Sequence, residues 1–405
     1  MSDESLNILY VSKYTSVENY DNRFPRSFQL LKSMADRGNR VTLLTSDSAH
    51  LTQSPVFTGA EHNEQVSGVE VYWLKTFKYK GAQSIRRVIS WLHFQWRLMA
   101  FDHQKIGSPD VIIVSCLSLL PVLFALRIKK LYGAKFIFEV RDIWPLTLTE
   151  VGKVSSLHPL VIIMGWLEKL AYNRADAVVG TMPNLKFHVR KRGSTEVPVY
   201  CVPMGVTPDS VIRTSNLTFR RSSSFKVYYA GSIGNDNALE WFFLAAEKLQ
   251  DYPDIEFHVV GEGRLKRNYA QKFKDNNNIK FKSRVSSDRI HKILQDADLL
   301  YFSCFNNIVW KSGQSLNKII DYMLAGKPIL GSYSGYQSMI NEAHCGWFVP
   351  AENVNAIVEK ILEIRQMDWS CRREMGERGR AWLIRERQFD LLARKYLEIL
   401  KHVQE

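Results

Sequence analysis

Short apolar runs alternate with amphipathic segments along most of the chain, and this alternation restricts the possible fold more than any other feature. The amphipathic segments carry apolar residues at helical spacing, and several end at glycine or proline. Short buried strands separated by helices are typical of a parallel sheet covered on both faces, so we predict an α/β fold. The predicted strands are residues 7–12, 40–45, 111–115, 136–140, 177–180, 226–230, 256–260, 298–303 and 328–331.

A polar stretch, residues 205–225, interrupts this pattern and is interpreted as a linker. It is rich in serine and arginine and contains few large apolar residues. A chain of 405 residues is also long enough for two or three domains. We therefore predict two Rossmann-like, doubly wound domains, residues 1–205 and 206–385. A final amphipathic helix, residues 386–405, is expected to pack back on the first domain.

The composition favours a cytoplasmic protein without a membrane-spanning helix. The five cysteines are scattered and include no C-x-x-C pair, which fits a reducing compartment and argues against a disulfide framework or a structural zinc site. The N-terminal residues lack the basic region of a signal peptide. The longest uncharged run, residues 111–126, contains Pro121 and is too short to span a bilayer.

The formal net charge of +13 indicates an anionic partner. The basic excess is spread over both halves of the chain rather than confined to a tail. Nucleic acid, an anionic membrane surface and a phosphorylated substrate are all compatible with this charge. The basic residues are not interleaved with a recognised RNA- or DNA-binding module, so we do not expect nucleic acid to be the partner.

Residues 313–328 predict a helix with an unusually placed lysine. Ser315 is the expected N-cap, and Lys318 then lies in the first turn, where the helix dipole disfavours a cation by roughly 0.3–1 kcal/mol. A bound anion would remove this conflict, because free backbone N–H groups and an ammonium together suit a phosphate. Asp321 follows one turn later and could accept hydrogen bonds from ribose hydroxyls. The alternative is an ordinary Lys318–Asp321 pair on a solvated face.

Two glycine loops follow predicted strands in the second half. Gly231, Gly234 and Asn235 belong to the first loop, and Glu262 lies between two glycines in the second. Glycine after a strand lets the backbone approach a ligand closely, and the following helix N-terminus suits a phosphate. Tight turns also use glycine, so each loop alone is weak evidence. Ligands of doubly wound folds bind at the carboxyl ends of the strands, where both loops would lie beside the Lys318 helix.

In the first half, Arg141 and Asp142 follow the strand 136–140 and are expected at the carboxyl edge of that sheet, facing the ligand. Arg23, in the first loop, is a further polar candidate. A structural salt bridge would explain Arg141 and Asp142 equally well. The sequence contains no Ser/His/Asp order, no H-x-x-x-H pair and no D-x-D pair suited to magnesium, so no metal site is predicted.

These motifs, taken together, resemble a known family. The second half contains G-S-I-G-N, G-E-G and S-L-N-K-x-x-D-Y-x-x-A-G-K-P, and the first half contains E-V-R-D-I-W-P and R-A-D-A-V-V-G-T-M-P. The chain resembles, over nearly its whole length, the retaining nucleotide-sugar glycosyltransferases of family 4. That resemblance implies the GT-B fold, in which two Rossmann-like domains face each other across a cleft. The chain is most similar to the bacterial surface-polysaccharide branch (O-antigen and capsule), which includes N-acetylfucosaminyl transferases.

The resemblance implies which residues bind the donor. Asp321 would hold the ribose, Lys318 would lie beside the diphosphate, and Arg284 and Val285 fall where backbone groups usually hold the uracil. The other implied donor-binding residues are Gly231, Gly234, Asn235, Glu262, Ser315, Leu316 and Asn317. The implied catalytic residues are Lys318, Asp142, Arg141 and Arg23. One departure matters: Gly313 occupies the position of the first acid of the family's E-x7-E motif, so one contact to the transferred sugar is missing.

The implied reaction moves a hexose or N-acetylhexosamine from a UDP-sugar to a lipid-linked saccharide acceptor, with retention and without a metal or other cofactor. Lys318 and helix N-termini would stabilise the leaving diphosphate. Two alternatives stay open. One is an enzyme that modifies a UDP-sugar, such as an epimerase, and the other is a non-catalytic homologue that binds a sugar nucleotide.

Residues 75–101 are predicted to dock on the anionic inner face of the membrane, which makes the protein peripheral there. The segment has six basic residues and no acidic one. A core helix would explain its apolar stripe, but not the additional aromatic residues Trp91, Phe94 and Phe101 beside charges of one sign. A second apolar segment, residues 157–167, is the other candidate contact. The stripe consists of Ile85, Val88, Ile89, Leu92, Trp96 and Met99.

Overall fold

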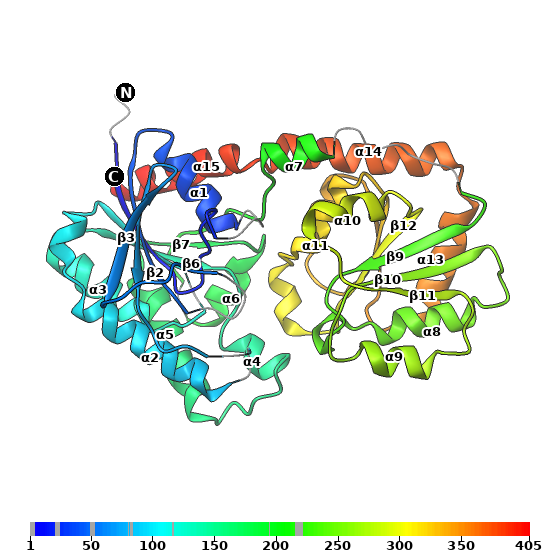
Figure 1. Ribbon diagram of the computed structural model, residues 1–405, viewed down its shortest axis with the longest axis horizontal. Helices are drawn as coiled ribbons and strands as arrows, with labels where there is room; N and C mark the ends of the chain where they lie inside the picture. Colours follow the sequence, from blue (N-terminus) through cyan, green and yellow to red (C-terminus); the bar gives the residue numbers. More distant parts are fainter. Residues whose placement is uncertain are drawn as a thin grey trace. The chain divides into compact units, whose positions relative to one another are not determined.

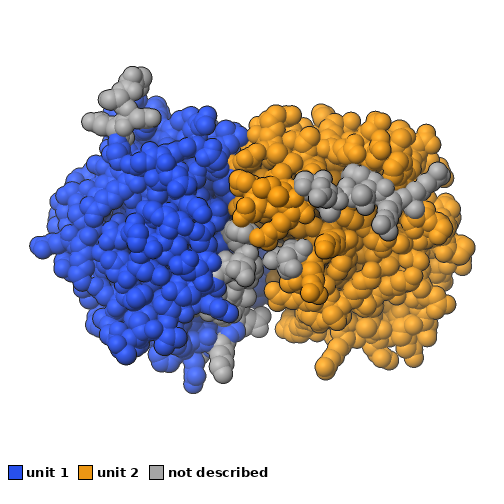
Figure 2. Space-filling model, turned by 45° about the horizontal axis from the view of Figure 1, so that its top comes forward, with its two compact units in different colours: residues 1–203, 389–405 blue, residues 204–388 orange. Residues whose placement is uncertain are grey.

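A computed structural model describes residues 5–20, 25–48, 53–79, 81, 84–115, 117–193, 195–214 and 222–405. The chain divides into two compact units (Figure 2). Unit 1 comprises residues 1–203 and 389–405, and unit 2 comprises residues 204–388. The division therefore falls two residues before the boundary expected at 205/206, and the last helix belongs to unit 1.

The described residues of unit 1 form an eight-stranded sheet with the order β3-β4-β2-β1-β5-β6-β7-β8. Every neighbouring pair is parallel except β3 and β4, which are antiparallel. The central strand β5 reads VIIVS and is buried throughout, as expected of a strand covered on both faces. The strands are β1 (Asn7–Val11), β2 (Arg40–Ser46), β3 (Glu61–Val66), β4 (Val69–Leu74), β5 (Val111–Ser115), β6 (Lys135–Val140), β7 (Ala177–Gly180) and β8 (Val199–Cys201).

Helices cover both faces of this sheet and enclose two apolar cores (Figure 1). One core includes residues of α2, α3, α5 and α6, and the other includes residues of α1 and α15. The C-terminal helix thus supplies part of the core of unit 1. The helical elements of the unit are α1 (Arg26–Ala35), α2 (Ile85–Ala100), η1 (His103–Ile106), α3 (Pro121–Tyr132), α4 (Leu146–Glu150), α5 (Pro159–Arg174), α6 (Leu185–Lys191) and α15 (Phe389–Gln404).

Unit 2 contains a six-stranded sheet among its described residues, with the order β11-β10-β9-β12-β13-β14 and parallel pairing throughout. Its strands are β9 (Phe225–Ala230), β10 (Ile255–Val260), β11 (Ile279–Lys282), β12 (Leu299–Ser303), β13 (Ile329–Ser332) and β14 (Gly346–Val349). Its helical elements are α7 (Pro208–Arg213), η2 (Asn235–Asn237), α8 (Glu240–Lys248), α9 (Lys266–Lys272), α10 (Ser287–Leu294), η3 (Ile308–Ser312), α11 (Asn317–Leu324), α12 (Met339–Glu342), α13 (Val354–Gln366) and α14 (Trp369–Glu386).

The predicted α/β class and all nine predicted strands are confirmed, and the strands that were missed lie mainly at sheet edges. β3, β8, β11 and β14 are edge strands, and β4 pairs with one of them. β3 reads EHNEQV and β11 reads IKFK, so both are partly polar and lack the apolar run that marks a buried strand.

Two of the expected boundaries were wrong. The predicted linker, residues 205–225, contains the helix α7, which begins after Thr207 because the Thr207 side chain accepts a hydrogen bond from the Ser210 N–H. Residues 215–221 of that stretch lie outside the described part. The expected C-terminal helix, residues 386–405, is α15, but it begins later, at Phe389. The preceding helix α14 ends at Glu386, and the residues between the two helices pair with Val206, whose N–H donates to the Arg387 carbonyl at 2.8 Å. Among the described helices, none combines the length and apolar character needed to cross a membrane.

Candidate functional site

The candidate site lies at the carboxyl edge of the unit 2 sheet. Because all the strands of this sheet are parallel, the loops after β9, β10, β11 and β12 emerge at the same edge. The loop after β9 begins at Gly231, and the loop after β10 begins at Gly261. β9 and β10 are neighbours, so both predicted glycine loops meet there.

The two glycine loops pack against each other backbone to backbone. The Gly231 N–H donates to the Val260 carbonyl at 3.0 Å, and the Ile233 N–H donates to the Glu262 carbonyl at 2.9 Å. A Cβ atom on Gly261 would lie 1.9 Å from the Gly231 carbonyl oxygen, which is a collision that backbone atoms cannot avoid. Glycine is therefore required here by this loop–loop contact, independently of any ligand.

Helix α11 is fixed to the end of β9 by Tyr322. The buried Tyr322 hydroxyl accepts a hydrogen bond from the Ala230 N–H at 2.9 Å and lies 3.1 Å from the carbonyl oxygens of Ala230 and Tyr301. The next residue after Ala230 is Gly231, so this contact sets the first turn of α11 beside the glycine loop.

The predicted N-cap of this helix was wrong. The cap residue is Leu316 rather than Ser315, and no side chain accepts a hydrogen bond from the first turn. The Leu316 side chain packs against the apolar core of unit 2, which holds this residue at the cap position. Asn317 and Lys318 are the first two helical residues.

Lys318 is half-buried, and its ammonium lies against neutral groups. Its Nζ donates to the Tyr229 hydroxyl at 3.1 Å and to Asn237 Oδ1, and it lies 4.6 Å from the centre of the Tyr229 ring. Burial lowers the pKa of Lys318 to about 8, because few surrounding groups compensate the charge. Lys318 forms no ion pair with any residue that the structure describes.

The Lys318 ammonium is also close to the first glycine loop. A Cβ atom on Gly231 would lie 3.3 Å from Lys318 Nζ. The expected alternative, an ordinary pair between Lys318 and Asp321, does not form. A half-buried ammonium therefore faces a loop where a ligand can approach the backbone, as a site for a phosphate requires.

Two residues that the sequence did not single out as part of the site hold Lys318 in place. Tyr229 donates from its hydroxyl to the Ser232 carbonyl at 2.7 Å, and Asn237 donates from Nδ2 to the same carbonyl at 3.1 Å. Asn237 also donates to Ser232 Oγ at 3.0 Å. A tyrosine at the end of a buried strand is usually a core residue, so no signal in the sequence distinguished Tyr229.

Asp321 lies one turn beyond Lys318 with 44% of its side chain exposed. The surrounding protein raises the pKa of Asp321 to about 7, but the exposed side hydrates the carboxylate and favours a lower value. A titratable neighbour is His291, whose Nε2 lies 3.9 Å from the carboxylate. Burial lowers the pKa of His291 to about 4, so this histidine is neutral near pH 7 and leaves the carboxylate open to a ligand.

The remaining predicted donor residues occupy the same edge. Glu262 pairs with Lys266 at 2.6 Å, which lowers the pKa of the carboxyl. Arg284 and Val285 follow β11, and the Arg284 backbone bonds to Glu262. Gly234 and Asn235 are in the first glycine loop, where Asn235 begins η2 and its side chain is exposed.

The other predicted residues belong to unit 1. Asp142 accepts hydrogen bonds from Trp144 Nε1 at 2.8 Å and from Thr147 Oγ1 at 2.7 Å, so both of its oxygens hold the loop after β6. Arg141 donates to Ser27 Oγ at 3.1 Å. Arg23 lies outside the described residues.

A fully buried ion pair lies at the end of β6, just before the loop that contains Arg141. Arg26 lies 3.2 Å from Glu139, which precedes Arg141 by two residues, and neither side chain is exposed. Tyr10 donates to the same carboxylate at 2.7 Å. Within the described part of the chain, no three His, Cys, Asp or Glu side chains gather in a way that could hold a metal ion.

Two family matches together span most of the chain. Residues 25–205 match the family described as Glycosyl transferase 4-like domain, and residues 224–366 match Glycosyl transferases group 1. No curated protein matches the chain by sequence.

Solved structures of the same fold cover nearly the whole chain at low identity. Sucrose-phosphate synthase from Thermosynechococcus elongatus has a TM-score of 0.72 and 15% identity, with 98% of both chains covered. A UDP-forming α,α-trehalose-phosphate synthase from Burkholderia xenovorans has a TM-score of 0.70 and 12% identity, with 99% of this chain and 100% of that chain covered. A glycosyltransferase from Rickettsia africae has a TM-score of 0.63 and 16% identity, with 99% of both chains covered.

Proposed function

Because the chain belongs to the glycosyltransferases of the GT-B fold, we propose that it transfers a hexose or N-acetylhexosamine from a UDP-sugar to a lipid-linked saccharide, with retention, in the synthesis of a bacterial surface polysaccharide. The observation that carries this proposal is Lys318, a half-buried ammonium with neutral partners beside a glycine loop. The Burkholderia relative is described as UDP-forming, which favours UDP as the leaving group.

In this proposal Lys318 and the first N–H groups of α11 bind the donor diphosphate. Negative charge grows on the diphosphate oxygen as the bond to the sugar breaks. A preorganised cation in a water-poor site stabilises that charge more than it stabilises the intact donor. No metal or other cofactor is required, because the stabilising charge comes from the protein itself.

Retention follows from attack on the same face of the sugar as the departing diphosphate. The acceptor hydroxyl forms the new bond to the sugar carbon, and its proton passes to the leaving diphosphate oxygen. Arg141, Arg23 and Asp142 are the proposed unit 1 residues for orienting the acceptor or the departing sugar. Since both Asp142 oxygens already accept hydrogen bonds, Asp142 would act by holding the Arg141 loop.

We further propose that unit 1 docks on the anionic inner face of the membrane through α2, α3 and α5. In α2 the exposed apolar side chains are Ile89, Leu92, Trp96 and Met99, with 56% of Leu92 and 58% of Trp96 open to solvent. The sequence-based interpretation of α2 was inverted, because the aromatic residues Trp91, Phe94 and Phe101 are the buried ones. Four residues of the stripe that a core helix would have explained are therefore on the exposed face, whereas Val88 packs against the core.

The neighbouring helices extend this apolar face and carry charge of the right sign. Leu131 of α3 is 52% exposed, and Ile162 and Trp166 of α5 are 56% and 59% exposed. All three helices border the same core of unit 1. α2 and α3 contain six arginines and lysines and no acidic residue, so positive charge predominates beside their exposed apolar side chains. Apolar side chains framed by cations fit an anionic lipid surface.

A donor screen tests the proposed reaction. Melting temperature should rise with UDP and with one or more UDP-sugars, and should stay unchanged with GDP- and ADP-sugars, since only a ligand of the folded state stabilises it. Release of UDP from that UDP-sugar should then require a membrane extract containing acceptor. Conversion of the sugar without UDP release would instead indicate an epimerase-like enzyme. Binding of the UDP-sugar without any turnover would indicate a non-catalytic homologue.

Asp321→Ala should weaken the binding of UDP and of the UDP-sugar to the same extent. The proposed contact is to ribose, which both ligands share, and loss of a hydrogen bond to a charged group costs about 1.5–3 kcal/mol, or roughly 10- to 100-fold in affinity. Calorimetric titration of both ligands measures this, with Asp251→Ala as an exposed carboxylate control in unit 2. Unchanged UDP affinity in Asp321→Ala would remove this residue from the site.

A further inference from the structure

A buried lysine lies at the carboxyl edge of the unit 1 sheet. Lys13 is the second residue after β1 and is only 2% exposed. Its Nζ donates to Ser46 Oγ at 3.0 Å and to the Ser48 carbonyl at 2.9 Å. Both acceptors are neutral, so hydrogen bonding does not neutralise this charge.

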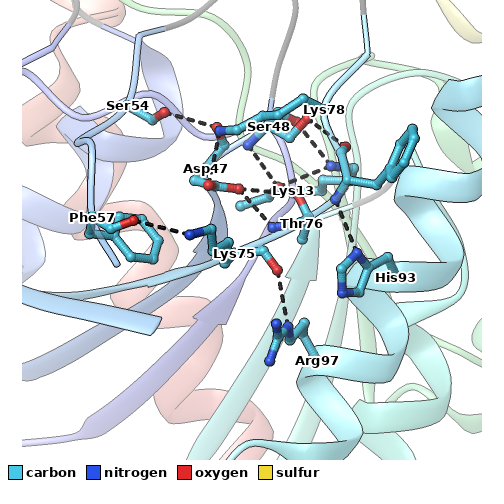
Figure 3. A network of polar contacts seen from close by, with 12 residues as sticks. Lys13, Asp47, Ser48, Ser54, Phe57, Lys75, Thr76, Lys78, His93 and Arg97 are labelled. Atoms are coloured by element: carbon cyan, nitrogen blue, oxygen red, sulfur yellow. Dashed lines mark hydrogen bonds and ion pairs between the residues drawn. The ribbon is translucent and has the colours of Figure 1, made fainter. Parts of the chain in front are cut away.

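Lys13 is the centre of a polar network formed by the ends of three neighbouring strands (Figure 3). Ser46, Asp47 and Ser48 come from the end of β2, and Thr76 and Lys78 follow β4. Asp47 accepts from the Thr76 N–H at 2.8 Å and pairs with Lys78 at 2.9 Å. These contacts hold the edge rigidly around the ammonium.

Positive charge exceeds negative charge in this network. Burial lowers the pKa of Lys13 to about 7. Asp47 opposes this shift and raises the pKa, whereas the positive charges of Lys78 and Arg87 lower it further. Partial burial lowers the pKa of the neighbouring His93, and the positive charges of Arg97 and Lys13 lower it further. Lys78 is 61% exposed, so this excess of charge reaches the surface. An unbalanced cluster of cations in a region of low dielectric favours the binding of an anion.

The cluster borders the exposed apolar face of α2. Arg87 lies on α2, and its guanidinium is 5.2 Å from the Trp91 ring and 5.6 Å from the Tyr14 ring. His93 accepts a hydrogen bond from the Phe77 N–H at 3.1 Å and lies 5.5 Å from the Trp96 ring, which is exposed. The cationic cluster and the exposed apolar side chains of α2 are therefore adjacent on one unit.

We propose that the edge formed by Lys13, Lys78 and Arg87 is an anion subsite that binds the phosphate or diphosphate group of the lipid-linked acceptor. This inference rests on the proposed function and adds where the acceptor is held. The apolar chain of such an acceptor would remain in the bilayer beside α2, while its phosphates would occupy the subsite. Lys13 and Lys78 would then place the acceptor sugar for the reaction.

Binding of farnesyl diphosphate to protein saturated with UDP tests this subsite. Saturation with UDP occupies the site at Lys318, so the remaining diphosphate binding reports on unit 1. Lys13→Met should reduce the affinity about 10-fold or more, as expected for a lost charge-assisted contact, and Lys78→Gln should reduce it several-fold. Lys191→Gln, an exposed lysine of α6, should leave it unchanged. Inorganic diphosphate, titrated in parallel, separates recognition of the phosphates from recognition of the lipid.

Equal binding of both probes, lost in Lys13→Met and Lys78→Gln, supports a subsite that recognises the phosphates alone. Tighter binding of farnesyl diphosphate, lost in the same variants, supports a subsite for a lipid diphosphate. The proposal is overturned if wild-type protein with UDP bound takes up neither probe, or if both variants bind like wild type. UDP affinity is measured separately for each protein, so a failure of this subsite is distinct from a failure of the donor site. Lys78 is exposed, so its variant keeps the test valid if Lys13→Met does not fold.

Discussion

Lys318→Met should reduce turnover by ~10²-fold or more while leaving the melting temperature equal or higher. The size of the loss follows from removing one preorganised group that stabilises charge in the transition state. The stability follows from partial desolvation, because a half-buried ammonium with neutral partners costs free energy that an apolar side chain of similar length does not. UDP release under saturating donor and acceptor, together with a thermal melt, measures both effects.

Lys327→Met is the matched control for this substitution. Lys327 is buried, and its pKa is lowered to about 8 like that of Lys318, but it lies beyond the other end of α11 and is influenced by Asp298. Its loss should alter stability and leave turnover close to that of wild type. If Lys318→Met keeps its activity and loses its stability instead, Lys318 is a structural residue and the donor site is not where we place it.

Leu92→Asp combined with Trp96→Asp should abolish the sedimentation of the protein with anionic vesicles. Removing two exposed apolar side chains from a membrane interface costs about 1.5–3 kcal/mol each, and the new carboxylates are repelled by the lipid as well. Wild-type protein should sediment with vesicles that contain an anionic phospholipid, and increasing salt should release it because the charges are screened.

Ile212→Asp is the matched control, since Ile212 is 68% exposed but belongs to α7 of unit 2. This variant should bind vesicles as wild type does, and all variants should keep their UDP affinity. Arg86→Glu should weaken binding without harming the fold, because Arg86 is exposed. Arg87 is less suitable, because its side chain packs against Tyr14, Trp91 and Trp144. A wild-type protein that ignores anionic vesicles at low salt would point to a soluble acceptor.

The sequence determined the fold class because buried parallel strands leave a local signature. Each central strand is a short apolar run, since both of its faces are covered, and residues 111–115 are typical. Edge strands are partly open to solvent, so β3 and β11 contain polar residues and lack the apolar run by which a strand is predicted. The motifs around Gly231 and Lys318 were visible for a similar reason, because residues close in sequence carry them.

Only the tertiary structure decided what surrounds those residues. The fold brings Tyr229 and Asn237 into hydrogen-bond contact with Lys318, although they precede it by 89 and 81 residues in the sequence. It also decided which face of α2 is buried, because a helix with apolar residues on two sides carries no local sign of which side meets the sheet. Lys13 was overlooked for the same reason: its neutral partners and the charges around it come from separate strands and helices. Local periodicity indicates which segments form strands and helices, whereas long-range contacts decide the environment that gives a side chain its chemistry.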